Sequence, residues 1–347
     1  MQIKKALCLA AAQQACAQSL SDVLASHNNS LSTLVSLLGQ QPELVNTLAG
    51  LQGITILAPS DQAFSAILAD PAVAAKVQSD PGFVATLLTY HVLNGTFYAS
   101  DLLGASDPAF VPTLMTDPAF STVSGGQRLR AQAEDGTVVI TTGNGAEAKV
   151  QATDFNFTGG TIHVIDNVLS IPPNLTDALA ENDLTSLTAA VVQANLVNTL
   201  SDLDQLTLFA PNNAAFDAIS AVAANLTIEE LTAVLGYHVI PGVVVYSSDV
   251  GNGTAQTVQG GEVTFTVQGN GIFVNDAQVV KPNILVKNGV VHVIDEVLIP
   301  SNANATPTST GIAPSATGTV VTGAAGMNSA ALGEIAVLAA AAGLFNL

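Results

Sequence analysis

The order of apolar and polar positions predicts helices first and strands afterwards. Apolar residues from Leu31 to Leu38 recur at helical spacing. The segment 55–64, TILAPSDQAF, predicts a buried strand that ends at a proline and leads into a helix capped by Ser60. The segment 83–92, FVATLLTYHV, is helix-like, and beyond it the apolar period changes from 3.6 to two.

The same pattern occurs again in the second half of the chain. The segment 207–216, TLFAPNNAAF, matches 55–64, with Asn212 at the capping position, and LTAVLGYHVI at 231–240 matches 83–92. Short strands are predicted beyond it, separated by Gly-Asn-Gly and Asn-Gly turns, at 243–246, 262–268, 272–274 and 284–287.

Each half closes on nearly the same phrase. Residues 160–169 read GTIHVIDNVL and residues 289–298 read GVVHVIDEVL, with seven of ten positions identical. Alternate residues of a strand share a face, so His163 and Asp166 point in opposite directions, as do His292 and Asp295. We therefore interpret these four residues as structural, hydrogen-bonded groups of a closing strand rather than as catalytic or metal-binding residues.

The three matched landmarks, in one order, indicate an internal duplication. Their offsets are 152, 147 and 129 residues, so the first half carries 18 extra residues between its second and third landmarks. Much of this excess is expected at 104–120, GASDPAFVPTLMTDPAF, which we interpret as a surface loop because surface loops tolerate insertions.

Length and charge restrict the class of protein. With 347 residues, the chain can form two domains that each bury a core. Beyond residue 17, six basic residues face 27 acidic ones, a balance of 6 − 27 = −21. Phosphate backbones repel such a surface, which excludes nucleic acid as a partner.

The N-terminal segment has the features of a secretory signal peptide. Lys4 and Lys5 precede an apolar run at 6–12, and Ala15-Cys16-Ala17 matches the small-residue cleavage pattern, so residues 1–17 are predicted to be removed. Both cysteines of the chain, Cys8 and Cys16, lie in this segment. The mature protein would then contain no disulfide and no thiol.

The C-terminal segment predicts a lipid anchor. Residues 301–328 are rich in Ser, Thr, Pro and Ala, which suits an O-glycosylated stalk, and the apolar end at 335–347 would span only about 20 Å as a helix. These features indicate a GPI-attachment signal whose residues 329–347 are removed, with Asn328 as the preferred attachment site and Gly326 or Gly323 as alternatives.

Seven N-x-S/T sequons predict N-glycosylation on a secreted chain. They begin at Asn28, Asn94, Asn156, Asn174, Asn225, Asn252 and Asn304.

The ordered motifs resemble the fasciclin-like (FAS1) domain, and they do so twice. The resemblance rests on T-x-x-A-P-x-x-x-A-F, then Y-H-V, then N-G-V-V-H-V-I-D-x-V-L, and the two units cover 19–172 and 174–300. It implies an α+β fold, a β-wedge or sandwich with packed helices. It also implies surface proteins that act in adhesion or in matrix or wall association, without enzymatic activity, cofactor or metal.

The resemblance also suggests residues for partner binding. In animal members, the Tyr-His region and an acidic-aliphatic stretch before the last hairpin are associated with integrin binding. The matching positions here are Tyr90, His91, Tyr237, His238, Asp154 and Phe155. Asn283 replaces the carboxylate in the second unit, so integrin binding is not predicted. The alternative for each Tyr-His pair is a half-buried structural pair with hydrogen-bonded polar tips.

No catalytic motif is found, since G-x-S-x-G, P-loop and H-E-x-x-H sequences are absent from the chain. We therefore predict a non-enzymatic, GPI-anchored glycoprotein of the outer plasma-membrane leaflet or cell wall. Its tandem domains would bind an extracellular protein, a glycan or a second copy of the chain. The alternative is a membrane-tethered protein of the secretory or vacuolar system that acts in membrane or organelle interaction.

Overall fold

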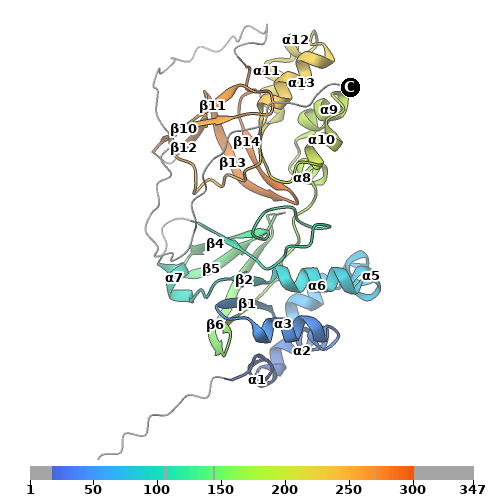
Figure 1. Ribbon diagram of the computed structural model, residues 1–347, viewed down its shortest axis with the longest axis vertical. Coiled ribbons are helices and arrows are strands. Elements are labelled where there is room, and N and C mark those ends of the chain that lie inside the picture. Colours follow the sequence, from blue (N-terminus) through green and yellow to red (C-terminus); the bar gives the residue numbers. More distant parts are fainter. Residues whose placement is uncertain (1–17, 105–107, 144, 270, 301–347) are drawn as a thin grey trace, which may run out of the picture.

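The computed structural model describes residues 18–104, 108–143, 145–269 and 271–300 (Figure 1). The predicted signal peptide, the stalk, the GPI signal, the sequon at Asn304 and the attachment sites Asn328, Gly326 and Gly323 lie outside these residues. Among the described residues, no helix is long and apolar enough to cross a membrane.

The first domain places its long helices before most of its strands. Its helices are α1 (Leu20–Ser26), α2 (Asn28–Gly39), α3 (Pro42–Gly50), α4 (Asp61–Ile67), α5 (Pro71–Ser79), α6 (Pro81–Tyr90) and α7 (Ala99–Leu103). Its strands are β1 (Ile54–Pro59), β2 (Val92–Asn94), β3 (Ala109–Pro112), β4 (Arg128–Glu134), β5 (Thr137–Thr141), β6 (Glu147–Phe157) and β7 (Gly160–Ile165).

The second domain repeats this order. Its helices are α8 (Leu175–Glu181), α9 (Thr185–Gln193), α10 (Val197–Ser201), α11 (Asn213–Ala218), α12 (Ser220–Ala223) and α13 (Ile228–Tyr237). Its strands are β8 (Leu206–Pro211), β9 (Val239–Pro241), β10 (Gly253–Gln256), β11 (Glu262–Gln268), β12 (Gly271–Val274), β13 (Ala277–Val286) and β14 (Gly289–Ile294).

The two sheets have the same topology. The first runs β2-β1-β7-β6-β5-β4-β3, and the second, read from its other edge, runs β9-β8-β14-β13-β12-β11-β10. In each sheet one pair is parallel, β1 with β7 and β8 with β14, and the other neighbours are antiparallel. The duplication inferred from the sequence is therefore a duplication of fold.

The repeated phrase forms an inner strand of each sheet. β14 is buried at every position because β8 and β13 flank it and the chain packs on both faces. The strand begins at Gly289, where an added Cβ would lie 1.9 Å from the Leu206 carbonyl oxygen, and Gly160 has the same relation to Ile54 at 1.8 Å. Only glycine permits this close approach of the parallel neighbours.

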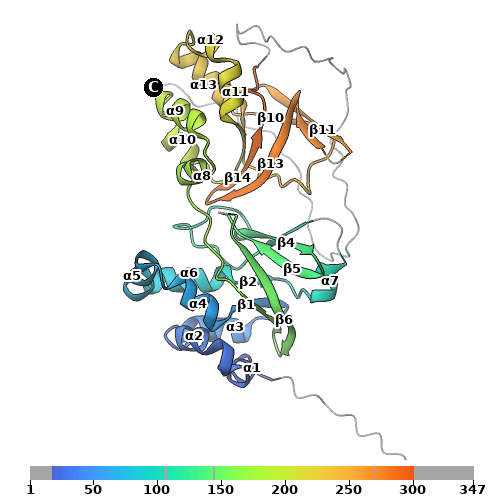
Figure 2. The ribbon, with the colours of Figure 1, turned by 180° about the vertical axis from the view of Figure 1, so that it is seen from behind.

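Local signals placed the helix starts correctly. Ser60 accepts a hydrogen bond from the Ala63 amide at 3.3 Å, and Asn212 accepts one from the Ala215 amide at 2.8 Å. Except for α7, which lies beside β4 and β5, the helices gather on one side of each sheet, and the two domains stack along the long axis of the molecule (Figures 1 and 2).

One predicted strand is wrong. Residues 243–246 follow β9 without forming a strand, because the Thr207 side chain satisfies their backbone instead. Its hydroxyl donates to the Val243 carbonyl at 2.9 Å and accepts from the Val245 amide at 2.9 Å.

The interpretation of 104–120 as a surface loop is also wrong. Among its described residues, 109–112 form the edge strand β3, with Phe110 and Val111 buried, and Met115 is fully buried beyond it. Most of the extra length lies just after this strand, since residues 113–127 join β3 to β4 whereas residues 257–261 join β10 to β11. This longer connection is called the insertion below.

Candidate functional site at the domain junction

The Tyr-His pairs are buried, so they cannot touch a partner in this conformation. Tyr90 and His91 end α6 with exposures of 0% and 3%, and Tyr237 and His238 end α13 with 6% and 1%. The Tyr90 hydroxyl donates to the Arg128 carbonyl at 3.2 Å, and the Tyr237 hydroxyl to the Glu262 carbonyl at 2.6 Å. The structural alternative therefore describes both pairs, and they are more deeply buried than the sequence suggested.

His91 and His238 each form hydrogen bonds to the end of a helix, α6 or α13, and to the segment that follows β7 or β14. His91 Nδ1 lies 2.7 Å from the Leu87 carbonyl, and its Nε2 accepts from the Leu169 amide at 2.9 Å. Because a carbonyl only accepts and an amide only donates, the proton sits on Nδ1 and the ring is neutral. Burial lowers the pKa of His91 to about 4, against the raising effect of its hydrogen bond to Leu87.

His238 repeats the arrangement in the second domain. Its Nδ1 lies 2.8 Å from the Val234 carbonyl, and its Nε2 accepts from the Leu298 amide at 2.9 Å. Burial lowers the pKa of His238 to about 4 as well, with the hydrogen bond to Val234 acting in the opposite direction.

Asp154 and Asn283, matched by the sequence offset, occupy equivalent β-bulges. Both have left-handed backbones, with φ of 63° and 65°. Asp154 accepts from the Ala99 amide at 3.2 Å, and Asn283 accepts from the Ser247 amide at 2.8 Å. Each side chain thus fastens the bulge to the segment that follows the edge strand, β2 in the first domain and β9 in the second. Phe155, beside the first bulge, is half-buried, with its ring centroid 4.2 Å from that of His27.

The histidines of the repeated phrase hold these bulges. His163 Nδ1 accepts from the Asp154 amide at 3.2 Å and its Nε2 donates to the Phe97 carbonyl at 2.8 Å. His292 bonds Asn283 and Val245 in the same way, and burial lowers its pKa to about 4, opposed by the hydrogen bond to Val245.

The aspartates of the phrase bond elsewhere. Asp166 accepts from the Lys149 amide at 2.7 Å, and Asp295 accepts from the Gln278 amide at 2.7 Å. His163 and His292 use both ring nitrogens on backbone groups, so neither histidine forms a dyad with the aspartate of its phrase. All four side chains thus bond backbone groups of neighbouring segments, and their structural role stays a prediction.

The insertion contacts the second domain directly. The Thr122 hydroxyl donates to the Asp204 carbonyl at 2.6 Å, and the Thr122 amide donates to the Lys287 carbonyl at 3.1 Å. The buried Gln127 side chain donates to the Val286 carbonyl at 3.0 Å. The segment that lengthens the first domain thus forms part of the joint between the two.

An aromatic contact completes the junction. Phe110 of β3 stacks on Tyr246 with ring centroids 4.4 Å apart and an interplanar angle of 17°. The Arg128 guanidinium lies over the Tyr246 ring, 5.2 Å from its centroid, which is within the distance of a cation–π interaction. Leu285 and Val290 join Phe110 and Tyr246 in one apolar cluster.

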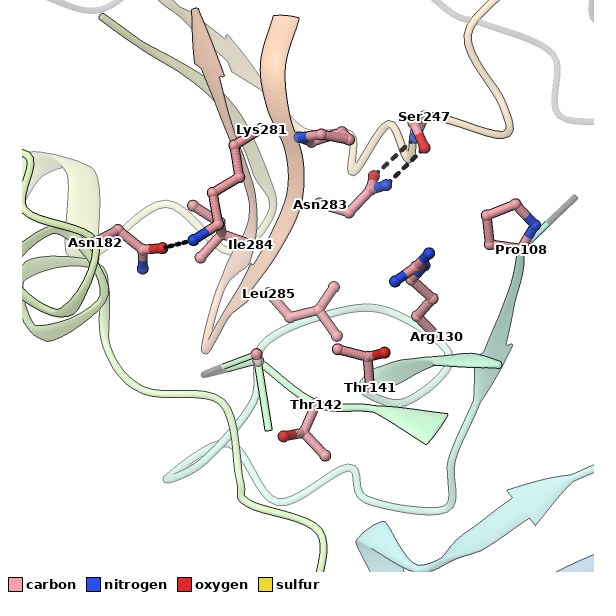
Figure 3. Close-up of a pocket in the computed structure, with 13 residues that line it drawn as sticks. Pro108, Arg130, Thr141, Thr142, Asn182, Ser247, Lys281, Asn283, Ile284 and Leu285 are labelled. Carbon is pink, nitrogen blue, oxygen red and sulfur yellow. Dashed lines mark hydrogen bonds between the residues drawn. The ribbon is translucent and has the colours of Figure 1, made fainter. Parts of the chain in front are cut away.

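A pocket of about 350 Å³ lies beside this cluster, between the domains (Figure 3). The first domain supplies Arg130 and Thr141 from neighbouring strands, and the second supplies Lys281 and Asn283 from β13 and Ser247 from the segment before β10. The volume is within the range of small-molecule sites. No motif indicated this pocket, because its halves lie about 150 residues apart in the sequence (281 − 130 = 151).

The side chains near the junction were also compared with the chemistry that metal binding and catalysis require. The part of the chain that the structure describes holds no group of three or more His, Cys, Asp or Glu residues able to bind a metal ion. Among the described residues that line the pocket, none is acidic, a histidine or a cysteine. Hydrogen-bonding and apolar side chains of this kind suit ligand binding.

The six described sequon asparagines are all exposed: Asn28, Asn94, Asn156, Asn174, Asn225 and Asn252. Asn174 also caps α8, since its side chain accepts from the Asp177 amide at 2.9 Å. Exposure meets the steric requirement of a glycosylation acceptor, and their modification stays a prediction.

The sequence matches the Fasciclin domain family twice, at residues 29–172 and 182–300. The class of protein is therefore one with two fasciclin (FAS1) domains in tandem. This chain belongs to the fasciclin domain family.

Fungal relatives match across both domains. A fasciclin-like arabinogalactan protein of Arthroderma benhamiae is 30% identical over 80% of this chain and 66% of its own length. The fasciclin-like arabinogalactan protein elcF of Phaeosphaeria nodorum is 31% identical over 82% of this chain and 89% of its own length.

A solved FAS1 domain pair of the insect cell adhesion molecule fasciclin I is 18% identical and covers 80% of this chain, with a TM-score of 0.39.

Proposed function

We propose that this chain is a non-enzymatic protein of the cell surface or cell wall, where its two FAS1 domains bind an extracellular partner. The observation that carries the proposal is the match of both domains, over at least 80% of the chain, to fungal fasciclin-like arabinogalactan proteins. The family is one of adhesion-type and wall-associated proteins, so a binding role is the natural inference for this member.

The geometry supports binding rather than catalysis. His91 and His238, whose side chains could in principle act as acid–base groups, are buried and hydrogen-bonded to backbone groups through both ring nitrogens. The solvent-facing cavity at the junction is lined by neutral hydrogen-bonding groups, apolar groups and two cations. Such a surface recognises a ligand without transforming it.

We also propose that the chain reaches the cell surface through the secretory pathway. A signal peptide at 1–17 and a GPI signal at 329–347 would deliver the domains to the outer leaflet on an O-glycosylated stalk. The partner would be an extracellular protein, a glycan or a second copy of the chain.

Localisation of the full chain, tagged after residue 18, tests this route. We expect surface labelling and release into the medium by a phosphatidylinositol-specific phospholipase. A variant truncated after residue 328 is the matched control, and we expect it to be secreted without treatment. Retention in internal or vacuolar membranes would instead favour the membrane-tethered alternative and contradict the surface assignment.

A further inference from the structure

Each domain places a tyrosine at the same point of its fold. Tyr98 of the first domain corresponds to Tyr246 of the second (246 − 98 = 148), because their neighbours make the same hydrogen bonds at the same offset. The carbonyls of Phe97 and Val245 each accept from the histidine of the repeated phrase at 2.8 Å. The amides that follow the two tyrosines donate to the side chains of the equivalent bulges. The backbone thus holds the two tyrosines in equivalent positions.

Asn156 of β6 corresponds in the same way to Leu285 of β13. Their offset (285 − 156 = 129) is the one that relates the two bulges and the two repeated phrases. Asn156 pairs with Thr161 of β7, and Leu285 pairs with Val290 of β14. An apolar pair of the second domain is therefore a polar pair in the first.

In the second domain these positions form the face on which the first domain docks. Tyr246, Leu285 and Val290 pack with Phe110 of β3 in one cluster, and each of the three side chains is no more than 1% exposed. This set of three residues is called the docking face below. Its burial comes from the junction, since Phe110 belongs to the other domain.

The equivalent face of the first domain consists of Tyr98, Asn156 and Thr161. The β13–β14 hairpin reaches the junction, whereas the β6–β7 hairpin points away from the second domain (Figures 1 and 2). Thr161 is buried, but Tyr98 is 42% exposed and Asn156 is exposed. A large aromatic ring is thus left open to solvent at the position where the second domain buries its tyrosine.

A second copy of the chain does not match this face. The ring that docks within the chain, Phe110, comes from the edge strand β3 and is already stacked on Tyr246. The corresponding edge strand of the second domain is β10, whose sequence Gly-Thr-Ala-Gln contains no aromatic residue. Neither edge of a second copy therefore offers a ring to place on Tyr98.

We propose that an N-glycan on Asn156 covers this face and shields the Tyr98 ring. Asn156 begins the sequon Asn-Phe-Thr, so the attachment point lies where the docking face has an apolar leucine. The C–H groups of a sugar ring pack on the face of an aromatic ring, and a glycan is bulky enough to keep another protein surface away. The glycan would cap this end of the two-domain stack, as polar outer faces cap the terminal units of repeat proteins. The proposal rests on the secretory route proposed above.

Nitration of tyrosine tests the shielding. Of the four tyrosines in the chain, Tyr98 is 42% exposed, against 0%, 6% and 1% for Tyr90, Tyr237 and Tyr246. Tetranitromethane applied to the folded full chain, purified from a eukaryotic host, therefore reports on Tyr98. Peptide mass spectrometry measures the nitration and the occupancy of each sequon. We expect Asn156 to be glycosylated, and enzymatic removal of the N-glycans from the folded protein to make Tyr98 react several-fold faster.

Sequon variants assign the effect to one glycan. Asn156→Gln should also raise the nitration rate of Tyr98 several-fold, and it should fold normally because this side chain is exposed. Asn94→Gln is the decisive control, since its sequon begins only four residues before Tyr98 (98 − 94 = 4), and it should nitrate at the parent rate. Asn225→Gln, an exposed sequon of the second domain, should likewise match the parent. Equal melting temperatures of the variants show that the rate reports shielding rather than unfolding.

Three results would overturn the proposal while leaving the secretory route in place. They are glycans at other sequons with Asn156 bare, a glycosylated Asn156 with Tyr98 nitrated as fast as in Asn156→Gln, or an increase in Asn94→Gln instead of Asn156→Gln. A chain with no glycan at any sequon would contradict the secretory route itself, and the shielding with it. The two failures are therefore distinguishable in the same mass spectra.

Discussion

Buried neutral histidines couple the stability of this protein to pH. His91, His238 and His292 each satisfy a backbone amide through one ring nitrogen and a backbone carbonyl through the other. Protonation would place a second N–H against an amide that can only donate. The same contact that locks each ring in one tautomer therefore disfavours its charged form.

We predict that the protein loses stability as the pH falls from 6.5 towards 4. The pKa of each of these histidines is lowered to about 4 in the folded chain, below its ordinary value of 6.5, so the unfolded chain binds more protons in this interval. Each ring should cost on the order of 2 kcal/mol between pH 7 and pH 5. Denaturant unfolding at several pH values measures this.

A His238→Ala variant supplies the control for that measurement. Its stability at pH 7 should be lower, because the Leu298 amide loses its acceptor, but its dependence on pH between 4 and 6.5 should be shallower than that of the parent. A slope identical to the parent's would show that His238 does not titrate with folding.

Asp295 stabilises its domain through one backbone contact. Asp295→Ala should lower the stability of the second domain by about 1 kcal/mol, since the exposed carboxylate accepts the Gln278 amide and closes the end of the β13–β14 pair. Thermal unfolding measures the loss, with Glu296→Ala as the neighbouring exposed control. Unfolding at the parent temperature would contradict the role assigned to this residue.

Among the elements, the parallel pair at the centre of each sheet is the most tightly constrained. Gly289→Ala should destabilise the second domain by roughly 3 kcal/mol or more, because the new Cβ would collide with the Leu206 carbonyl and separate β14 from β8. Chemical denaturation measures the loss.

Gly39→Ala is the matched control for this substitution. No atom lies within 4 Å of the position its Cβ would take, so its stability should be unchanged or slightly raised. Equal effects of the two substitutions would mean that the close approach of the strands is not what requires glycine.

In the whole molecule, β3 and the insertion turn two domains into one unit. Phe110→Ala should loosen the junction, because it removes the ring that stacks on Tyr246 within the apolar cluster between the domains. Small-angle scattering should then report a larger radius of gyration, with both domains still folded.

Phe64→Ala provides the comparison. Phe64 is buried in the core of the first domain, so its loss should lower stability without extending the molecule. A Phe110→Ala scattering profile that superimposes on that of the parent would show that the aromatic contact does not hold the domains together.

Sequence patterns were sufficient wherever the relevant contact is local or repeated. The caps at Ser60 and Asn212, the helices that end in Tyr-His and the strands of the repeated phrase all follow from spacing within about ten residues, and the duplication follows from the recurrence of these motifs in one order. The match of Asp154 with Asn283 followed from the offset between the copies, and both lie in equivalent bulges.

Long-range packing determined the rest. A sequence of 15 residues from 113 to 127 looks like any loop until its partners are known, and those partners, Asp204, Val286 and Lys287, lie in the other domain. Tyr90 and Tyr237 were candidates for partner contact on the sequence alone, but in the structure both side chains are buried in the core. The pocket is lined by Arg130 of the first domain and Lys281 of the second, and such a shared lining is a property of how two folded domains pack, which no pattern within either domain encodes.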